Sequence, residues 1–300
     1  MKAVQKVRIS PDSAFASHHL HAPHFDHNWH FHAEYQLFVV LEGTGTRFIG
    51  DHVEPFSPGD LVFTGPDLPH LWRSDPEYFE GDRTKQTEGV VIYFHEDLLG
   101  QALLGKNEAL RIRQLLARTR RGIRFTGHTQ QEAARRMKEL PPLRDFDRVL
   151  ALLQLLHFLS ESEEYHLLAG EGYTNVLKAE DTERMNHVHA YVMQHFREKI
   201  SLEAAAALAN MTPTSFSRYF RTHANKTFSD FLSEIRIGYA CKLLLEKKLD
   251  VAQIAYESGF QTLSNFNRQF REITSYSPLA YRRTYADAGY PGNRPPHTED

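Results

Sequence analysis

Histidines with the spacing of metal ligands lie near the start of the chain. Seven of the eighteen histidines fall within residues 18–32. His30, His32 and Glu34 alternate, so in an extended strand their side chains would project from one face. His70 follows in a second apolar segment, and three imidazoles with one carboxylate can coordinate zinc, nickel or iron. The pattern predicts either a divalent-metal site or the polar wall of a pocket. The histidines before residue 28 are expected in an exposed arm or loop.

Arginines and phenylalanines recur at a fixed spacing in the C-terminal third. A shift of 50 residues superimposes two copies of one pattern. The matched residues are Thr212, Phe216, Arg218, Phe220 and Arg221 on Thr262, Phe266, Arg268, Phe270 and Arg271. In each copy the phenylalanines lie at i and i+4 and mark the buried side of a helix, while the arginines lie on the other side. A guanidinium on an exposed helix face is suited to bind guanine edges or phosphates.

Each copy contains the signals for two short helices joined by a tight turn. The expected N-terminal capping residues are Ser201, Thr212 (followed by Pro213), Asp250 and Thr262. Gly259 can adopt the left-handed conformation that ends a helix. Such a pair of helices, with one buried face and one face bearing arginine, indicates a helix-turn-helix motif.

The segment between the copies has a length that matches DNA. Phe228 to about Glu246 can form one continuous helix, which at 1.5 Å per residue spans about 28 Å. One turn of B-DNA rises about 34 Å, so the second helix of each copy can enter successive segments of the major groove. Double-stranded DNA is therefore the predicted partner.

Charge is distributed unequally along the chain. Residues 183–285 contain 14 lysines and arginines against 9 aspartates and glutamates, a net charge of +5. The remaining residues contain 21 basic and 29 acidic side chains, a net charge of −8, so the formal total is only −3. A basic domain of this kind is typical of phosphate binding.

The elements that must position these residues are of two kinds, and we expect an α+β chain. Short apolar runs between Gly and Pro turns, such as Tyr35–Leu41 and Gly89–Phe94, predict a β-barrel or sandwich. From about Glu96 apolar residues recur at helical spacing, most clearly from Val149 to Leu159. We expect that helix to pack on the β domain or to form a dimer interface. The predicted divisions are a β domain at 1–95, helices at 96–162, a linker at 163–182, an all-α domain at 183–287 and a disordered tail at 288–300.

Composition excludes several classes of protein. The single cysteine, Cys241, cannot form a disulfide within the chain. The sequence contains no run of about 18 uncharged apolar residues, so no membrane span is expected. The first residues lack the apolar core of a signal peptide. A cytoplasmic protein without membrane contact is expected.

The second copy closely resembles the C-terminal signature of AraC/XylS-type transcription regulators. It reads VAQIAYESGFQTLSNFNRQFREITSYSPLAYRR, and the matching residues are Ile254-Ala255, Gly259-Phe260, Phe266, Arg268, Phe270, Ser277-Pro278 and Tyr281-Arg282. The first copy fits the same family through Ala206, Met211-Thr212, Arg218, Phe220 and Arg236. This resemblance covers about 100 residues. It implies two helix-turn-helix units joined by a long helix, in a DNA-binding regulator rather than an enzyme.

The resemblance also implies which side chains contact DNA. The base-facing positions are Thr214, Ser217 and Arg218 in the first unit and Leu263, Ser264, Asn267 and Arg268 in the second. Arg218 and Arg268 can each bind guanine O6 and N7, and Asn267 can pair with adenine. Arg221 and Arg271 are expected to contact phosphates.

Two turns depart from the family pattern, which has glycine after each recognition helix. This chain has Asn225 and Ser275 there. Asparagine tolerates positive φ, whereas serine does so poorly. We therefore expect a local alteration of the second turn without loss of the fold.

The N-terminal histidines lie in a segment that resembles the cupin signature. An H-x-H pair with a following glutamate precedes Gly43, and Pro58-Gly59-Asp60 precedes a Pro-x-x-His-like end at His70. Glu34 comes sooner after His32 than in metal-binding cupins. The resemblance implies a barrel that holds either a divalent metal (zinc, nickel or iron) on His30, His32, Glu34 and His70, or a small molecule without metal.

These observations favour a transcription regulator with a cupin-like sensor domain. The resemblance implies a small-molecule effector, with carbohydrate as the expected class, and suggests activation of transcription through RNA polymerase by a homodimer. The alternatives are a metal-dependent cupin enzyme and a metal-responsive regulator, both built on His30, His32, Glu34 and His70.

Overall fold

The computed structural model describes residues 9–10, 12–25, 29–80, 85–173, 179–246 and 248–285. The chain forms two compact units, an N-terminal one that extends to Ala179 and a C-terminal one that begins at Glu180. The predicted tail at 288–300 lies outside the described residues. Within the described part of the chain, the helices fall short of the length and hydropathy required to cross a bilayer.

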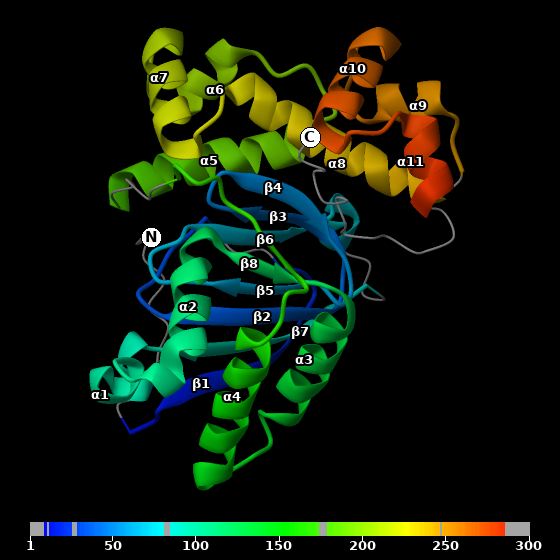
Figure 1. Cartoon of the computed structure of the whole chain (residues 1–300). Coiled ribbons are helices and arrows are strands. Elements are labelled where there is room, and N and C mark those ends of the chain that lie inside the picture. Colours follow the sequence, from blue (N-terminus) through cyan, green and yellow to red (C-terminus); the bar gives the residue numbers. More distant parts are fainter. Residues whose placement is uncertain are drawn as a thin grey trace. The chain divides into compact units, whose positions relative to one another are not determined.

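The N-terminal unit is built from two antiparallel sheets (Figure 1). The larger sheet has the strand order β1-β7-β2-β5-β8-β9 and the smaller one the order β4-β3-β6. The strands are β1 (Phe15–Ala22), β2 (Tyr35–Glu42), β3 (Gly45–Ile49), β4 (His52–Phe56), β5 (Leu61–Thr64), β6 (His70–Ser74), β7 (Thr87–Phe94), β8 (Ile123–Phe125) and β9 (Tyr165–Leu167). Together with the helical C-terminal unit, this confirms the predicted α+β class.

Both faces of the larger sheet are buried, which explains its uninterrupted apolar sequences. On β2, Leu37 and Val39 belong to a core that also includes the helices, whereas Phe38 and Val40 belong to a second core with Phe56 and other residues of the barrel interior. Because successive side chains of a strand point to opposite faces, a strand covered on both sides loses the usual alternation of apolar and polar residues.

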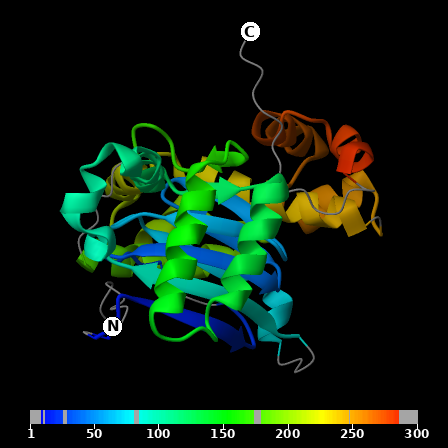
Figure 2. The ribbon, with the colours of Figure 1, turned by 60° about the horizontal axis from the view of Figure 1, so that its bottom comes forward.

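Two helices lie across the outer face of the larger sheet. Figure 2 shows α3 (Gly127–Glu139) and α4 (Asp145–Ser160) side by side as green helices over the strands. On α4, Leu152, Leu155, Leu156 and Leu159 are at most 1% exposed, which confirms that this stripe packs on the β domain. Shorter elements precede them, namely η1 (Pro76–Phe79), η2 (Glu96–Leu99), α1 (Gly100–Leu104), η3 (Asn107–Ala109), α2 (Leu110–Arg118) and η4 (Thr119–Arg121).

Three segments differ from the sequence-based expectation. His18, His19 and His21 belong to strand β1, which pairs with β7, and not to an arm or loop. Strand β8 interrupts the region predicted as helical, and β9 lies inside the segment predicted as a linker. Each of these last two strands has only three residues, too few to produce a readable period, and both are held in place by pairing with strands distant in sequence.

The C-terminal unit repeats one pair of helices. Its elements are α5 (Ala179–His195), α6 (Leu202–Leu208), α7 (Pro213–Ala224), α8 (Phe228–Glu246), α9 (Val251–Glu257), α10 (Leu263–Thr274) and α11 (Pro278–Tyr285). Helices α7 and α10 are both 12 residues long and begin 50 residues apart, and α8 is the predicted single long helix. The repeat is thus structural as well as sequential.

The predicted caps are present at all four helices of the repeat. The hydroxyls of Ser201, Thr212 and Thr262 accept hydrogen bonds from the backbone N–H three residues later, at 3.1 to 3.3 Å. Asp250 forms a capping box with Gln253, in which each side chain accepts a hydrogen bond from the other residue's backbone N–H. These bonds satisfy donors that a helix leaves free at its start.

The turns after the two second helices have the same backbone geometry. Asn225 has φ 53° and Ser275 has φ 65°, both in the left-handed region. The backbone N–H of Ser275 also donates to the carbonyl of Arg271 at 2.9 Å. The expected alteration of the second turn is therefore absent, because serine adopts the conformation that the family usually assigns to glycine. A left-handed residue with a Cβ costs about 1–2 kcal/mol.

Arg236, on α8, joins the end of α5 to the second helix-turn-helix. Its Nε donates to the carbonyl of Phe196 and its Nη2 to that of Glu198, both at 2.7 Å. Burial lowers the pKa of this guanidinium. Gly259 lies against the same segment with φ 86°, and a Cβ there would come within 2.5 Å of the Phe196 carbonyl oxygen. Both the left-handed turn and the close approach require glycine.

A buried ion-pair network links the two sheets of the N-terminal unit. Arg47 on β3 is fully buried and donates to both carboxylate oxygens of Asp60 at 2.5 to 2.6 Å. Arg124 on β8 lies with its Nε 3.3 Å from the same carboxylate. One aspartate, in the turn before β5, thus holds two guanidinium groups from different sheets.

Replacing Asp60 by Ala should lower the free energy of unfolding of the N-terminal unit by about 3–5 kcal/mol, because it leaves two buried guanidinium groups without their shared carboxylate. Thermal and urea denaturation of the full chain would measure the loss. Glu77→Ala removes an exposed ion pair with Lys85 and serves as the control, with no expected change in the unfolding midpoint of the N-terminal unit. Equal losses in the two variants would contradict the role assigned to Asp60.

Replacing Ser275 by Gly should stabilise the C-terminal unit by about 0.5–1 kcal/mol, because glycine adopts left-handed φ without steric cost. Hydrogen exchange of the α10 amides in the full chain would report the change. Asn225→Gly is the matched control and should give a smaller gain, since asparagine already tolerates this conformation. A larger gain at residue 225 would count against this account.

Candidate DNA interface and ligand site

The second helix of each repeat has one fully buried and one exposed face. Phe216 and Phe220 on α7, and Phe266 and Phe270 on α10, are all 0% exposed. The residues predicted to contact DNA are all exposed, namely Thr214, Ser217, Arg218, Arg221, Leu263, Ser264, Asn267, Arg268 and Arg271. The phenylalanine pairs therefore fix the rotation of each helix, and the rotation brings the predicted contact residues to one solvent-exposed face.

The two arginine-bearing helices differ in how the arginine is held. Arg268 donates through Nη1 to both carboxylate oxygens of Glu272 at 3.0 and 3.1 Å, and through Nη2 to Oδ1 of Asn265 at 3.0 Å. In the first copy the position of Glu272 is taken by Thr222, whose hydroxyl donates to the carbonyl of Arg218. Arg268 is thus oriented by two neighbours on its own helix, and Arg218 lacks the equivalent carboxylate.

Three histidines converge inside the N-terminal unit. His30, His32 and His70 are 7%, 2% and 1% exposed, and one nitrogen of each lies within 4.8 Å of those of the others. His30 is held by an isolated β-bridge to His70, at the start of β6, with backbone bonds of 2.9 and 3.3 Å. The structure thus brings together three of the four predicted ligands.

Backbone carbonyls orient two of the three imidazoles. Nδ1–H of His32 donates to the carbonyl of Glu34 at 3.0 Å, and Nδ1–H of His70 donates to that of Leu68 at 2.7 Å. Nε2 of both rings therefore faces the common centre, close to the side chain of Gln36. Burial lowers the pKa of His32, which favours a neutral imidazole with a free lone pair.

Glu34 does not join the three histidines. Its Oε2 lies 3.4 Å from Nδ1 of His32, the nitrogen that faces away from the centre, and its Oε1 lies 3.8 Å from Nε2 of His95. The prediction assumed a continuous strand through His30, His32 and Glu34, but β2 begins only at Tyr35. Gln36 is the residue that sequence reasoning missed. Its place on β2, alternating with Tyr35 and Leu37 of the outer core, is the signal that could have identified it.

Three imidazoles in a buried cluster suit zinc or another divalent transition metal. In His32 and His70 the carbonyl bonds at Nδ1 fix the tautomer in which Nε2 carries the lone pair, as in many metal sites in proteins. The residues present therefore fit such an ion, although the fourth predicted ligand is displaced.

A cluster of buried apolar side chains adjoins the histidines inside the barrel. Phe38 packs edge-on against Trp72, whose ring lies 5.8 Å from that of His70. The buried residues of this core are Phe25, Phe38, Val40, Ile49, Phe56, Val62, Leu68, Trp72, Val91 and Leu168. The histidines therefore adjoin a packed apolar interior.

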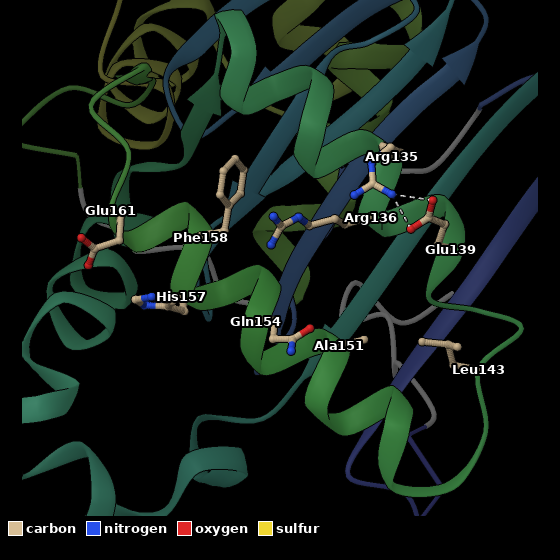
Figure 3. A pocket seen from close by; sticks show the side chains of 9 residues that line it. All are labelled: Arg135, Arg136, Glu139, Leu143, Ala151, Gln154, His157, Phe158 and Glu161. Atoms are coloured by element: carbon tan, nitrogen blue, oxygen red, sulfur yellow. Dashed lines mark hydrogen bonds and ion pairs between the residues drawn. The ribbon is translucent and has the colours of Figure 1, made fainter.

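A groove of about 690 Å³ lies outside the barrel, between α3 and α4 (Figure 3). Arg136 lies over the ring of Phe158 at 4.4 Å, and Arg135 pairs with Glu139. Its lining residues are Arg135, Arg136, Glu139, Leu143, Ala151, Gln154, His157, Phe158 and Glu161.

Both units match known protein families. A model of the AraC-like ligand binding domain matches residues 13–168, more than half of the chain, and a helix-turn-helix domain model matches residues 205–284. The chain belongs to the AraC family of transcription regulators. The matches agree with the cupin-like sensor and the double helix-turn-helix expected from the sequence, and they identify a regulator rather than an enzyme.

The reported relatives match either most of the chain or about a third of it. The HTH-type transcriptional activator RhaS of Enterobacter sp. (strain 638) is 27% identical over 286 residues, which cover 91% of this chain and 89% of RhaS. The uncharacterized HTH-type transcriptional regulator YobQ of Bacillus subtilis (strain 168) is 28% identical over 99 residues, 33% of this chain and 41% of YobQ. The crystal structure of the DNA-binding domain of AdpA, a global transcriptional factor, in complex with a target DNA, is 31% identical over 33% of this chain and 88% of that domain, with a TM-score of 0.32.

Proposed function

We propose that this AraC-family regulator reads DNA with the exposed faces of α7 and α10, under control of an effector bound by the N-terminal unit. The observation that carries the proposal is the rotation of both helices. Four fully buried phenylalanines turn the predicted contact residues toward solvent, and the surrounding region has a net charge of +5. A basic, exposed helix of this kind is suited to the major groove.

The contact residues divide into two groups by their chemistry. Arg218, Arg268 and Asn267 carry forked donors or an amide and are proposed to read base edges. Arg221 and Arg271 lie one turn further along and are proposed to bind phosphates. The smaller residues Thr214, Ser217, Leu263 and Ser264 lie near the helix starts and complete the base-facing surface.

Replacing Arg218 or Arg268 by Ala should weaken binding to the specific operator by about 1–3 kcal/mol and relax the preference for one base pair. Replacing Arg221 or Arg271 by Ala should weaken binding to all sequences alike and lower the salt slope by about 1. Electrophoretic mobility shifts on a selected operator and on random DNA, each at several salt concentrations, would separate the two effects. Unchanged affinity in both Arg218→Ala and Arg268→Ala would refute the base-contact assignment.

One relative supports a proposal for the direction of regulation. RhaS is named a transcriptional activator, and its match covers both units of this chain. We propose that this protein also activates transcription, through contact with RNA polymerase, in the cytoplasm. The effector is proposed to be a small molecule bound by the N-terminal unit, with carbohydrate as the proposed class.

The outer face of α4 supports a homodimer. Phe146 and Leu150 are one helical turn apart and are 66% and 43% exposed, so they form an adjacent pair of apolar side chains in contact with solvent. The groove between α3 and α4 begins beside these residues, at Ala151, and continues along the same helix to Phe158. In an antiparallel pair of α4 helices, the exposed side chains of each copy would reach the groove of the other, which is a self-complementary arrangement.

Replacing Phe146 or Leu150 by Glu should convert the dimer to a monomer, because the charge would be buried in the apolar interface. Sedimentation velocity of the full chain over a concentration series would measure the change. Leu103→Glu is the control, since Leu103 on α1 is 49% exposed and is not among the residues that line the groove. A dimer that survives both α4 substitutions would exclude this interface.

A metal-responsive regulator is the second candidate function. The observation that favours it is the buried cluster of His30, His32 and His70, which offers ligands suited to zinc, nickel or iron. In this case the ion itself would be the effector. Operator affinity measured with and without added zinc would distinguish it from a regulator controlled by an organic molecule.

A further inference from the structure

The side chain of Gln36 occupies the point on which two of the histidines converge. Its Oε1 lies 3.2 Å from Nε2 of His32 and 3.1 Å from Nε2 of His70. Gln36 is 4% exposed, and both imidazoles are buried as well. The carboxamide is therefore enclosed with the histidines, and its contacts there must be satisfied by the protein or by a bound ion.

In these contacts the Gln36 amide oxygen, a hydrogen-bond acceptor, faces two imidazole nitrogens that are also acceptors. Nδ1 of His32 and of His70 each lies at a backbone carbonyl oxygen, which can only accept, so both Nδ1 atoms carry the proton. In a neutral imidazole, Nε2 then presents a lone pair. The carboxamide oxygen of Gln36 also presents lone pairs, so three acceptors point at one another at hydrogen-bond distance.

Two arrangements resolve this conflict while both imidazoles stay neutral. A rotation of the carboxamide by 180° would place its NH₂ group where the oxygen lies, and its two N–H bonds could then donate to the two Nε2 atoms. Alternatively, a cation at the centre would accept all of the lone pairs at once. The first arrangement suits an empty site and the second a loaded one.

We propose that Gln36 is the fourth ligand of a zinc site formed with His30, His32 and His70, and that its carboxamide rotates when the ion binds. This inference rests on the second candidate function. In the empty site the amide NH₂ bridges the imidazoles of His32 and His70, and in the loaded site the amide oxygen coordinates the ion. A zinc site with bonds near 2.0 Å requires ligand nitrogens about 3.3 Å apart, so the cluster closes slightly on binding.

Glu34 has a supporting part in this arrangement. Three imidazoles and an amide are neutral and leave the charge of the ion uncompensated among its ligands. The Glu34 carboxylate, 3.4 Å from Nδ1 of His32, places a negative charge on the outer side of that ring. A carboxylate in this position orients a metal-bound histidine and increases its basicity.

Zinc chloride titrated into the metal-stripped full chain, followed by calorimetry, tests the proposal. The wild type should bind one equivalent per chain. Gln36→Ala should bind with about 10–100-fold lower affinity, as found for residues that support metal sites. Gln36→Glu should bind more tightly than the wild type, because it adds a negative ligand of nearly the same shape. Gln154→Ala, in the groove on α4, is the matched control and should not change the affinity.

The side-chain amide resonances of Gln36 give an independent readout. They should shift on addition of zinc in the wild type, while those of Gln154 stay in place. A wild type that binds no zinc would overturn this inference together with the metal-responsive candidate, leaving the DNA-binding function to its own test. A wild type that binds zinc, with Gln36→Ala and Gln36→Glu of equal affinity to it, would overturn the part assigned to Gln36 alone. Circular dichroism of each metal-free variant confirms that the comparison is made between folded proteins.

Discussion

Two guanidinium groups and one carboxylate, all nearly inaccessible to water, define how the two sheets of the sensor unit meet. Arg47 comes from the small sheet and Arg124 from the large one, and Asp60 lies between them. The turn that carries Asp60 is also tied to β2, since Val40 donates to the Asp60 carbonyl and Gly59 to that of Val40. Charges removed from water are tolerated only when their partners are in place. The positions of β2 and β3, and through β3 that of β6 with His70, therefore depend on this one contact.

The two helix-turn-helix units of the C-terminal unit fix the rotation and the end of their second helices in the same way. Pairs of phenylalanines one turn apart anchor α7 and α10, and a left-handed residue ends each helix. What the repeats do not share is the surroundings of the arginine. Glu272 and Asn265 restrain Arg268, which reduces the entropy lost when it binds a base, but Glu272 must also release the guanidinium. The two helix-turn-helix units thus have the same fold, but Arg268 is held more rigidly than Arg218.

Local patterns predicted the helical unit well, because caps, i and i+4 phenylalanines and the left-handed Gly259 act within a few residues of one another. The sensor unit depends on pairings across long stretches of sequence. The strands Ile123–Phe125 and Tyr165–Leu167 have no period of their own, and only their partners define them. The histidine site was predicted in part for the same reason. His30 joins His70 through an isolated bridge, so the alternation that pointed to Glu34 did not hold and Gln36 took its place.

The pairing of β9 with the larger sheet determines where an isolated N-terminal fragment can end. Strand β9 forms one edge of the larger sheet and pairs with β8. The β8 residues Ile123, Arg124 and Phe125 are all buried. A sensor fragment that stops at residue 162 would expose the backbone donors and acceptors of β8 along an apolar edge, and such an edge promotes aggregation by pairing with other chains. A fragment that continues through Ala169, whose N–H donates to the carbonyl of Arg121, retains the covering strand. The solubility of the isolated sensor unit therefore depends on residues 163–169, which the sequence alone predicts as part of a linker.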